Sequence, residues 1–120
     1  MKYQGPVYEK SFEFALTIIR LYKKLIGQNE HIISKQLLKS GTSIGANINE
    51  GSAAESRNDF KHKMAIASKE ARESLYWLWL LKKGNLVDVN VDNEIKDCDE
   101  LVRLLTSIVK STLKTPHQNK

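Results

Sequence analysis

Apolar residues recur at every third or fourth position through most of the chain, which is the spacing of one face of an α-helix. The first stretch with this pattern has its apolar stripe at Phe14, Ile18, Leu21 and Leu25. Gly5-Pro6 lies before the stretch and Gly27 lies after it, which suits a helix start and a helix end. The pattern predicts a first helix over about residues 7–26.

The second stretch mixes large and small side chains on one helical face. Its helix-spaced positions are Ile33, Leu37, Ser40, Ile44, Ile48 and Gly51. Gly41 and Gly45 each cost about 1 kcal/mol of helix propensity relative to alanine, so their presence indicates close backbone approach, a kink or a contact site. We predict a second helix over residues 31–51, folded back on the first through a short turn at residues 28–31.

The third stretch has the most regular pattern, with alternating steps of four and three. Its positions are Phe60, Met64, Ala67, Ala71, Ser74, Leu78 and Leu81. Ser56 with Asp59 resembles a capping box that uses a shorter acid, and Gly84 is placed to end the helix. The pattern predicts a third helix over residues 57–83, whose small residues would let a neighbouring helix approach closely.

The fourth stretch repeats the same register and has a second apolar line beside it. The first line is Val91, Ile95, Cys98, Val102, Leu105 and Val109, and the second is Leu101, Leu104 and Ile108. We predict a fourth helix over residues 92–114.

Four amphipathic helices with short connections predict an all-α fold, an antiparallel up-down-up-down four-helix bundle, with residues 1–120 forming one domain. Apolar residues beyond one seam indicate a thick core or burial against other subunits.

Composition and charge fit a helical domain and add little about its partners. The chain is 41% hydrophobic and 28% charged, as expected for a folded chain, and its formal net charge of +5 favours acidic partners such as nucleic acid. No apolar run approaches the roughly 18 residues that a membrane span needs, and the N-terminus lacks the apolar core of a signal peptide. We therefore expect a cytoplasmic protein without a membrane partner.

The residues needed for catalysis or metal binding are few. Cys98 is the single cysteine, so one chain can form neither a disulfide nor a site with several thiolates. A carboxylate-bridged metal pair in a bundle needs two Glu-x-x-His motifs, and the sequence offers only the related run from Asp59 to His62. Residues 41–51 lack the lysine and the spacing of a phosphate-binding loop. We expect no enzyme, no metal and no cofactor.

Basic residues form local stripes on three of the predicted helices. They are Arg20, Lys23 and Lys24 on the first, Arg57 and Lys61 on the third, and Arg103, Lys110 and Lys114 on the fourth. Two interpretations stay open. One is a solvated face that suits the helix dipoles. The other is a phosphate-binding surface, enlarged by oligomerisation, that binds nucleic acid with strong salt dependence and little sequence specificity.

Three aromatic residues lie close together near the end of the third predicted helix. Trp77 and Trp79 are two residues apart, so they point to different faces and cannot both enter one narrow seam. With Tyr76, they favour packing in the core or at a subunit interface, and a platform for base stacking is the alternative.

A polar set follows steps of four and three along the second predicted helix, at Ser43, Asn47 and Glu50. Glu50 lies near a helix C-terminus, where the macrodipole disfavours a negative charge, so a basic partner is expected. The candidate partners are Arg57, Lys69 and Arg72. The favoured interpretation is a structural network that fixes the corner between the second and third helices, and a ligand or partner site is the alternative.

The same segment carries a family resemblance. Residues 43–51 match the pattern Ser-Ile-x-Ala-Asn-Ile-x-Glu-Gly, which ends at Gly51, and residues 67–77 loosely match an Ala-x-x-Ser-x-x-Glu pattern. With these motifs the chain resembles the family of four-helix bundles encoded in intervening sequences of bacterial 23S ribosomal RNA genes. Gly45 stands where many members have proline, a difference that affects a local kink.

The resemblance implies four antiparallel helices assembled as a homopentameric ring with a central channel. The bundle is also similar to the accessory protein of diversity-generating retroelements, a basic pentamer that binds nucleic acid and partners a reverse transcriptase. Our leading hypothesis is a non-enzymatic homo-oligomer that binds structured RNA or DNA through surface lysines and arginines. The alternatives are an accessory subunit of a reverse transcriptase and a purely structural protein-interaction module.

Overall fold

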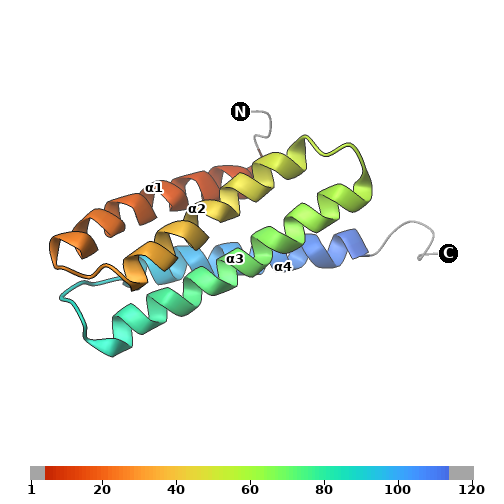
Figure 1. Ribbon diagram of the computed structural model, residues 1–120. Coiled ribbons are helices and arrows are strands. Elements are labelled where there is room, and N and C mark those ends of the chain that lie inside the picture. The colour runs from red at the N-terminus through yellow and green to blue at the C-terminus, as the bar shows by residue number, and fades with distance from the viewer. Residues whose placement is uncertain (1–4, 114–120) are drawn as a thin grey trace.

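The computed structural model describes residues 5–113, and over that range the chain forms four helices and no strand (Figure 1). The expectation of an all-α fold is therefore confirmed. The helices are α1 (Pro6–Gly27), α2 (Ile33–Ser52), α3 (Arg57–Gly84) and α4 (Asp92–Leu113). Within the same residues, no helix is both long enough and apolar enough to cross a lipid bilayer.

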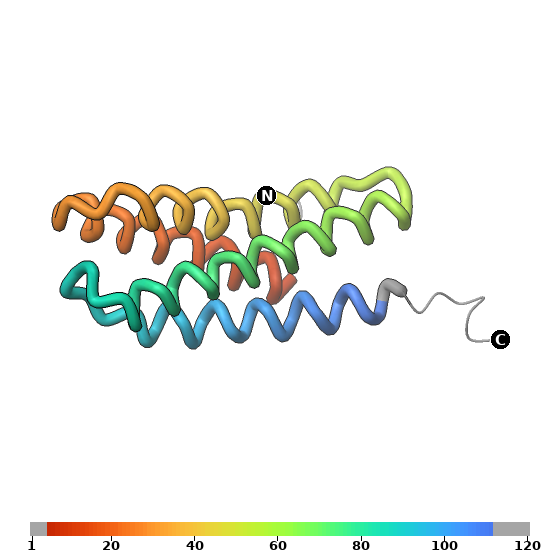
Figure 2. The backbone as a smooth tube through the Cα atoms, turned by 60° about the horizontal axis from the view of Figure 1, so that its bottom comes forward, coloured from red at the N-terminus to blue at the C-terminus, as the bar shows by residue number. Residues whose placement is uncertain are grey.

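The helices pack around one core in the cyclic order α1, α2, α3, α4. Each helix contacts its two neighbours in this order, and α1 and α4 share the least contact. Over residues 5–113, the backbones of α1 and α3 do not approach each other closely, so the outer faces of these two helices lie on diagonally opposite sides of the molecule. Figures 1 and 2 show the α1–α2 turn and the α3–α4 loop at one end, and the α2–α3 turn at the other.

The turn and the loop that share an end are joined by Gln28 and Asp88. The side-chain amide of Gln28 donates from Nε2 to the carbonyl oxygen of Asp88 at 2.9 Å. The backbone N–H of Asp88 donates in return to Gln28 Oε1 at 2.8 Å. We call this pair of hydrogen bonds the Gln28–Asp88 link. It connects segments sixty residues apart in sequence.

The core contains most of the large side chains that the spacing assigned to it. The buried set includes Phe14, Ile18, Leu21, Leu25, Leu37, Ile44, Ile48, Met64, Leu78 and Leu81. On α4 the prediction was only partly right. Cys98 and Leu105 of the first line are buried together with Leu101 of the second, whereas Ile95 and Val102 are only partly buried. The buried face of α4 thus lies between the two apolar lines.

The glycines of α2 permit close packing against α1. A Cβ atom added to Gly41 would lie 3.1 Å from two side-chain carbons of Ile18, and one added to Gly45 would lie 3.2 Å from Ser11 Oγ. Both contacts are tighter than ordinary van der Waals contact. Of the three explanations open from the sequence, the structure therefore supports close backbone approach.

Helix α2 begins at Ile33, two residues later than predicted, because Glu30 caps it. The Glu30 carboxylate accepts backbone N–H bonds from Ile32 at 3.1 Å, Ile33 at 3.0 Å and Ser34 at 2.6 Å. The Ser34 hydroxyl donates back to the Glu30 carbonyl oxygen at 2.7 Å. Burial alone would raise the pKa of Glu30, but these hydrogen bonds outweigh it and hold the pKa below its ordinary value of 4.5.

Candidate functional site

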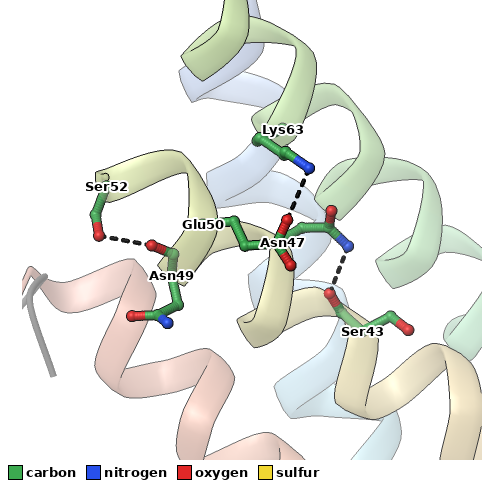
Figure 3. A network of polar contacts seen from close by, with 6 residues as sticks. All are labelled: Ser43, Asn47, Asn49, Glu50, Ser52 and Lys63. Atoms are coloured by element: carbon green, nitrogen blue, oxygen red, sulfur yellow. Dashed lines mark hydrogen bonds and ion pairs between the residues drawn. The ribbon is translucent and has the colours of Figure 1, made fainter. Parts of the chain in front are cut away.

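The polar set on α2 forms separate contacts rather than one continuous network (Figure 3). Asn47 Nδ2 donates to the carbonyl oxygen of Ser43 at 2.8 Å, and Ser43 Oγ donates to that of Lys39 at 2.7 Å. Both bonds stay within the helix. Only Glu50 reaches α3, where its Oε1 atom accepts a hydrogen bond from Lys63 Nζ at 2.7 Å.

The partner of Glu50 is therefore Lys63, and the sequence-based candidates Arg57, Lys69 and Arg72 were not the right ones. Lys63 packs next to Gly51 of α2, whereas Arg72 donates to Thr106 of α4 and Lys69 is exposed. The hydrogen bond and the negative charge of Glu50 raise the pKa of Lys63 above its ordinary value of 10.5. The bond joins the two helices at the corner that the motif was expected to fix.

Gly51 ends the motif at the closest point of this corner. It is buried, and a Cβ atom added to it would lie 2.6 Å from Met64 Cε and 3.3 Å from Lys63 Cβ. A larger residue would require the Met64 side chain to move and would crowd Lys63 Cβ. Glu50 and Gly51 thus contact α3, whereas the hydrogen bonds of Ser43 and Asn47 stay within α2.

The described residues offer little for metal binding or nucleophilic chemistry. Over residues 5–113, no group of three or more His, Cys, Asp or Glu side chains is arranged to hold a metal ion. Cys98 is buried and its thiol donates to the carbonyl oxygen of Ala71 at 3.3 Å. Burial first, then the charges of Asp99 and Asp97, raises the pKa of Cys98 to about 12, so the thiol stays protonated at neutral pH.

The structure divides the predicted basic residues between the two ends of the bundle. Arg20, Lys23 and Lys24 are exposed on the last turns of α1, near the α1–α2 turn. Arg57 and Lys61 lie on the first turns of α3, at the opposite end. One patch therefore cannot include both groups.

Arg103 and Lys110, the predicted basic residues of α4 that the structure describes, are exposed on the surface of that helix. Arg57 lines one shallow depression, and Arg103 and Lys110 line a second that shares Ser107 and Ser111 with the first. The guanidinium of Arg103 also pairs with Asp99 at 2.9 Å. Lys114 was predicted with this group and lies outside the described residues.

A further basic surface, not selected from the sequence, runs along the outer face of α3. We define the α3 stripe as Lys69, Arg72, Tyr76, Trp79 and Lys83, all of which are exposed. Steps of three and four place them on one face, opposite the side of α3 that is buried in the core. The signal is present in the sequence as this spacing, where Lys69 and Arg72 are candidate partners of Glu50 and the aromatic residues favour packing, with base stacking as the alternative.

The side chains of the α3 stripe have defined neighbours. Arg72 Nη2 donates to Thr106 Oγ1 of α4 at 2.9 Å. The ammonium groups of Lys82 and Lys83 lie 5.4 Å and 5.9 Å from the centre of the Trp79 ring. Lys82 also pairs with Asp92 at 2.8 Å.

The two tryptophans do point in different directions, as their spacing required. Trp77 is partly buried, and its Nε1 donates to Glu73 at 3.2 Å. Tyr76 and Trp79 are 58% and 42% exposed, so the core does not account for them. The rings of Tyr76 and Trp77 meet edge to face, with 5.2 Å between their centres. Packing thus explains Trp77 and part of the Tyr76 ring, and the exposed surface of Tyr76 and Trp79 needs another explanation.

A second exposed surface lies on the outer face of α1. We define the α1 apolar stripe as Phe12, Leu16 and Ile19, which are 43%, 36% and 36% exposed. They follow steps of four and three, as in a helix seam that packs on another helix. In contrast to the α3 stripe, all three members are apolar.

Comparisons with known proteins identify similar chains. A family model described as 23S rRNA-intervening sequence protein matches residues 4–107. A crystal structure from Bacteroides thetaiotaomicron VPI-5482, described as a protein with unknown function from the S23 ribosomal protein family, is 48% identical in sequence. That match covers 87% of this chain and 98% of that chain, with a TM-score of 0.82. A comparison with curated proteins found no match.

Proposed function

Since the chain belongs to the 23S rRNA-intervening sequence protein family, as the motif at residues 43–51 indicated, we propose that it binds structured nucleic acid and catalyses no reaction. In this proposal it is a cytoplasmic, antiparallel up-down-up-down bundle that assembles as a homopentameric ring. Its partners are further copies of itself and RNA or DNA.

The α3 stripe is the observation that carries the proposal. Three of its members, Lys69, Arg72 and Lys83, are cationic and exposed, and none of the five members is acidic. Cations spaced along one helix face can follow a phosphate backbone and release its counterions, which gives affinity without sequence specificity. The depression lined by Arg57 lies between α3 and α4. The one lined by Arg103 and Lys110 lies on α4 and includes Thr106, to which Arg72 donates, so it extends the cationic surface.

The α1 apolar stripe supports self-association. A closed ring with an odd number of subunits needs contacts between two different surfaces of each chain. The stripe offers one such surface, because burying exposed apolar side chains against a neighbour is favourable. Assembly would then place several α3 stripes on one particle, and their combined avidity would exceed the affinity of a single chain.

Gel-shift titration of the full chain with structured RNA and with duplex DNA, at two salt concentrations, tests nucleic-acid binding. The expected result is binding at low salt that weakens steeply at high salt. The variant Lys69→Gln/Arg72→Gln/Lys83→Gln should lose most of it. Its matched control, Arg20→Gln/Lys23→Gln/Lys24→Gln, removes the same number of charges from the last turns of α1, outside the α3 stripe, and should lose less. Absence of binding at low salt would overturn the proposal, and equal loss in both variants would remove the α3 stripe from it.

Multi-angle light scattering tests the assembly. We expect a pentameric mass for the natural sequence and dissociation for Leu16→Glu, which puts a charge in the α1 apolar stripe. Ile32→Glu is the control, because Ile32 is 77% exposed and lies outside the stripe. A clean monomer for the natural sequence would overturn the proposed ring.

A second candidate function is that of an accessory subunit for another protein, such as a reverse transcriptase. The observation in its favour is the same apolar surface on α1, which a different protein could cover. An adjacent reverse transcriptase gene with a template repeat would support this candidate, whereas a surrounding ribosomal RNA gene would support the first one.

A further inference from the structure

Tyr76 and Trp79 stand one helical turn apart in the middle of the α3 stripe, with Arg72 before them and Lys83 after them. We propose that the α3 stripe binds unpaired nucleotides, whose bases stack on Tyr76 and Trp79 while their phosphates contact the flanking cations. This inference rests on the proposed function and specifies which form of nucleic acid the surface prefers.

The exposure of the two rings is the first reason for this preference. Aromatic side chains usually lose most of their accessible surface in a folded chain, yet Tyr76 is 58% exposed and Trp79 is 42% exposed. In a duplex the faces of the bases are covered by their neighbours, so an aromatic ring gains little there. An unpaired base has a free face, and when it stacks on an aromatic side chain both the base and the side-chain ring lose solvent-exposed surface.

The contacts of Trp79 are compatible with stacking. The ammonium groups of Lys82 and Lys83 are near its ring at 5.4 Å and 5.9 Å. At an exposed site a cation on a ring is a weaker interaction than a stacked base. A base can therefore displace Lys83, whose ammonium becomes available to the phosphate next to that base, while Lys82 keeps its ion pair with Asp92.

Arg72 is placed to hold the backbone of the bound strand. Its Nη2 atom donates to Thr106 of α4, which fixes the guanidinium at the α4 side of the α3 stripe rather than leaving it to sample solvent. A fixed guanidinium loses less conformational entropy when a phosphate binds to it. Positioned cations and two rings on one face provide both parts of a surface for single strands.

The charge of the α3 stripe favours nucleic acid over a protein partner. Arginine, tyrosine and tryptophan are enriched at protein interfaces, but lysine is depleted there relative to the rest of the surface. The α3 stripe contains Lys69 and Lys83, and Lys82 lies beside it, whereas the α1 apolar stripe contains no charged residue. The two outer faces thus have different chemistry, and the apolar one suits a second copy of the chain.

The test compares one oligonucleotide, single-stranded and annealed into a duplex, in binding titrations with the full chain at fixed ionic strength. The variant Trp79→Leu should weaken binding of the single strand about fivefold or more and leave the duplex nearly unchanged. Trp79→Phe keeps an aromatic ring and should recover most of the lost affinity. Circular dichroism establishes that both variants are folded, as expected for an exposed position.

Other results separate this inference from the proposed function. No binding of either form by the natural sequence would overturn both. Binding of both forms with no effect of Trp79→Leu, or with an equal effect on single strand and duplex, would overturn the stacking inference and leave the proposed function standing. A change in the light-scattering mass of Trp79→Leu without nucleic acid would make the α3 stripe a subunit interface and would also overturn the inference.

Discussion

Ser40 of α2 and Ser74 of α3 hydrogen-bond to each other across the helix interface, with 2.8 Å between their Oγ atoms. Both residues are fully buried. Ser74 has a carbonyl acceptor at 2.9 Å, the oxygen of Glu70, so we assign Ser40 as the donor within the pair. The other acceptor near Ser40 is the carbonyl oxygen of Leu37 at 3.4 Å, a long and weak contact.

This direction predicts an asymmetry between two alanine substitutions. Ser74→Ala leaves the buried hydroxyl of Ser40 with only its long contact, and should lower the free energy of unfolding by about 1 kcal/mol. Ser40→Ala should cost less, because Ser74 keeps its bond to Glu70. Denaturant titrations of both single variants and the double variant measure the difference. A larger cost for Ser40→Ala would contradict the assigned direction.

The Glu50–Lys63 bond predicts a stability difference that disappears in alkali. Glu50→Ala should lower the melting temperature at neutral pH, because it removes the bond to Lys63. The decrease should be slight, because the substitution also removes a charge that the α2 dipole disfavours. The raised pKa of Lys63 means that its contribution is complete below 10.5 and is lost as the pH rises through the folded-state value. Glu55→Ala, at an exposed turn position, is the control. An unchanged melting temperature would count against a structural role for Glu50.

Glu30 predicts the opposite pH dependence. Glu30→Gln should lower the free energy of unfolding by about 1 kcal/mol at neutral pH, since a charged cap of the α2 start is lost. The pKa of Glu30 is depressed in the folded chain, so its contribution is complete above 4.5 and is lost as the pH falls through the folded-state value. Urea titrations of both proteins on either side of 4.5 should show the difference shrinking in acid. A constant difference would mean that ionisation of Glu30 does not matter.

Cys98 should be nearly inert in the folded chain. Its pKa of about 12 keeps the thiol protonated, whereas the unfolded chain forms thiolate from about the ordinary value of 9.0. Iodoacetamide at mildly alkaline pH should therefore label Cys98 slowly in buffer and rapidly in denaturant. Rapid labelling without denaturant would refute this prediction.

The raised pKa of Cys98 also makes the free energy of unfolding decline as the pH rises between 9.0 and about 12, because only the unfolded state loses the proton. Cys98→Ala should lack this decline in stability with pH.

The helices could be predicted because apolar spacing depends only on which side of each helix meets the core. Leu25, Ile44 and Leu78 were assigned to that side and are buried. The cap by Glu30 was not predictable from the same rule. It requires a turn in which Asn29 adopts a positive φ of 64°, and only that turn brings the carboxylate to the first N–H groups of α2.

The candidate site was harder to predict, because it depends on how helices are turned relative to one another. The need of Glu50 for a basic partner was clear, but the choice of Lys63 depends on the length of the α2–α3 turn and the rotation of α3. The spacing from Lys69 to Lys83 was visible in the sequence, whereas the exposure of Trp79 beside them was not. Aromatic residues surrounded by leucines are usually packed, and here one of two tryptophans points outward.

Residues 53–56 are the single stretch of chain that joins the α1–α2 pair to the α3–α4 pair. Two copies of the chain could trade these helical pairs by straightening that turn, which is domain swapping. At the other end of the bundle, the Gln28–Asp88 link crosses the boundary between the same two pairs. Both of its hydrogen bonds must open before an exchange can begin, so the link raises the kinetic barrier to swapping and favours bundles built from one chain each.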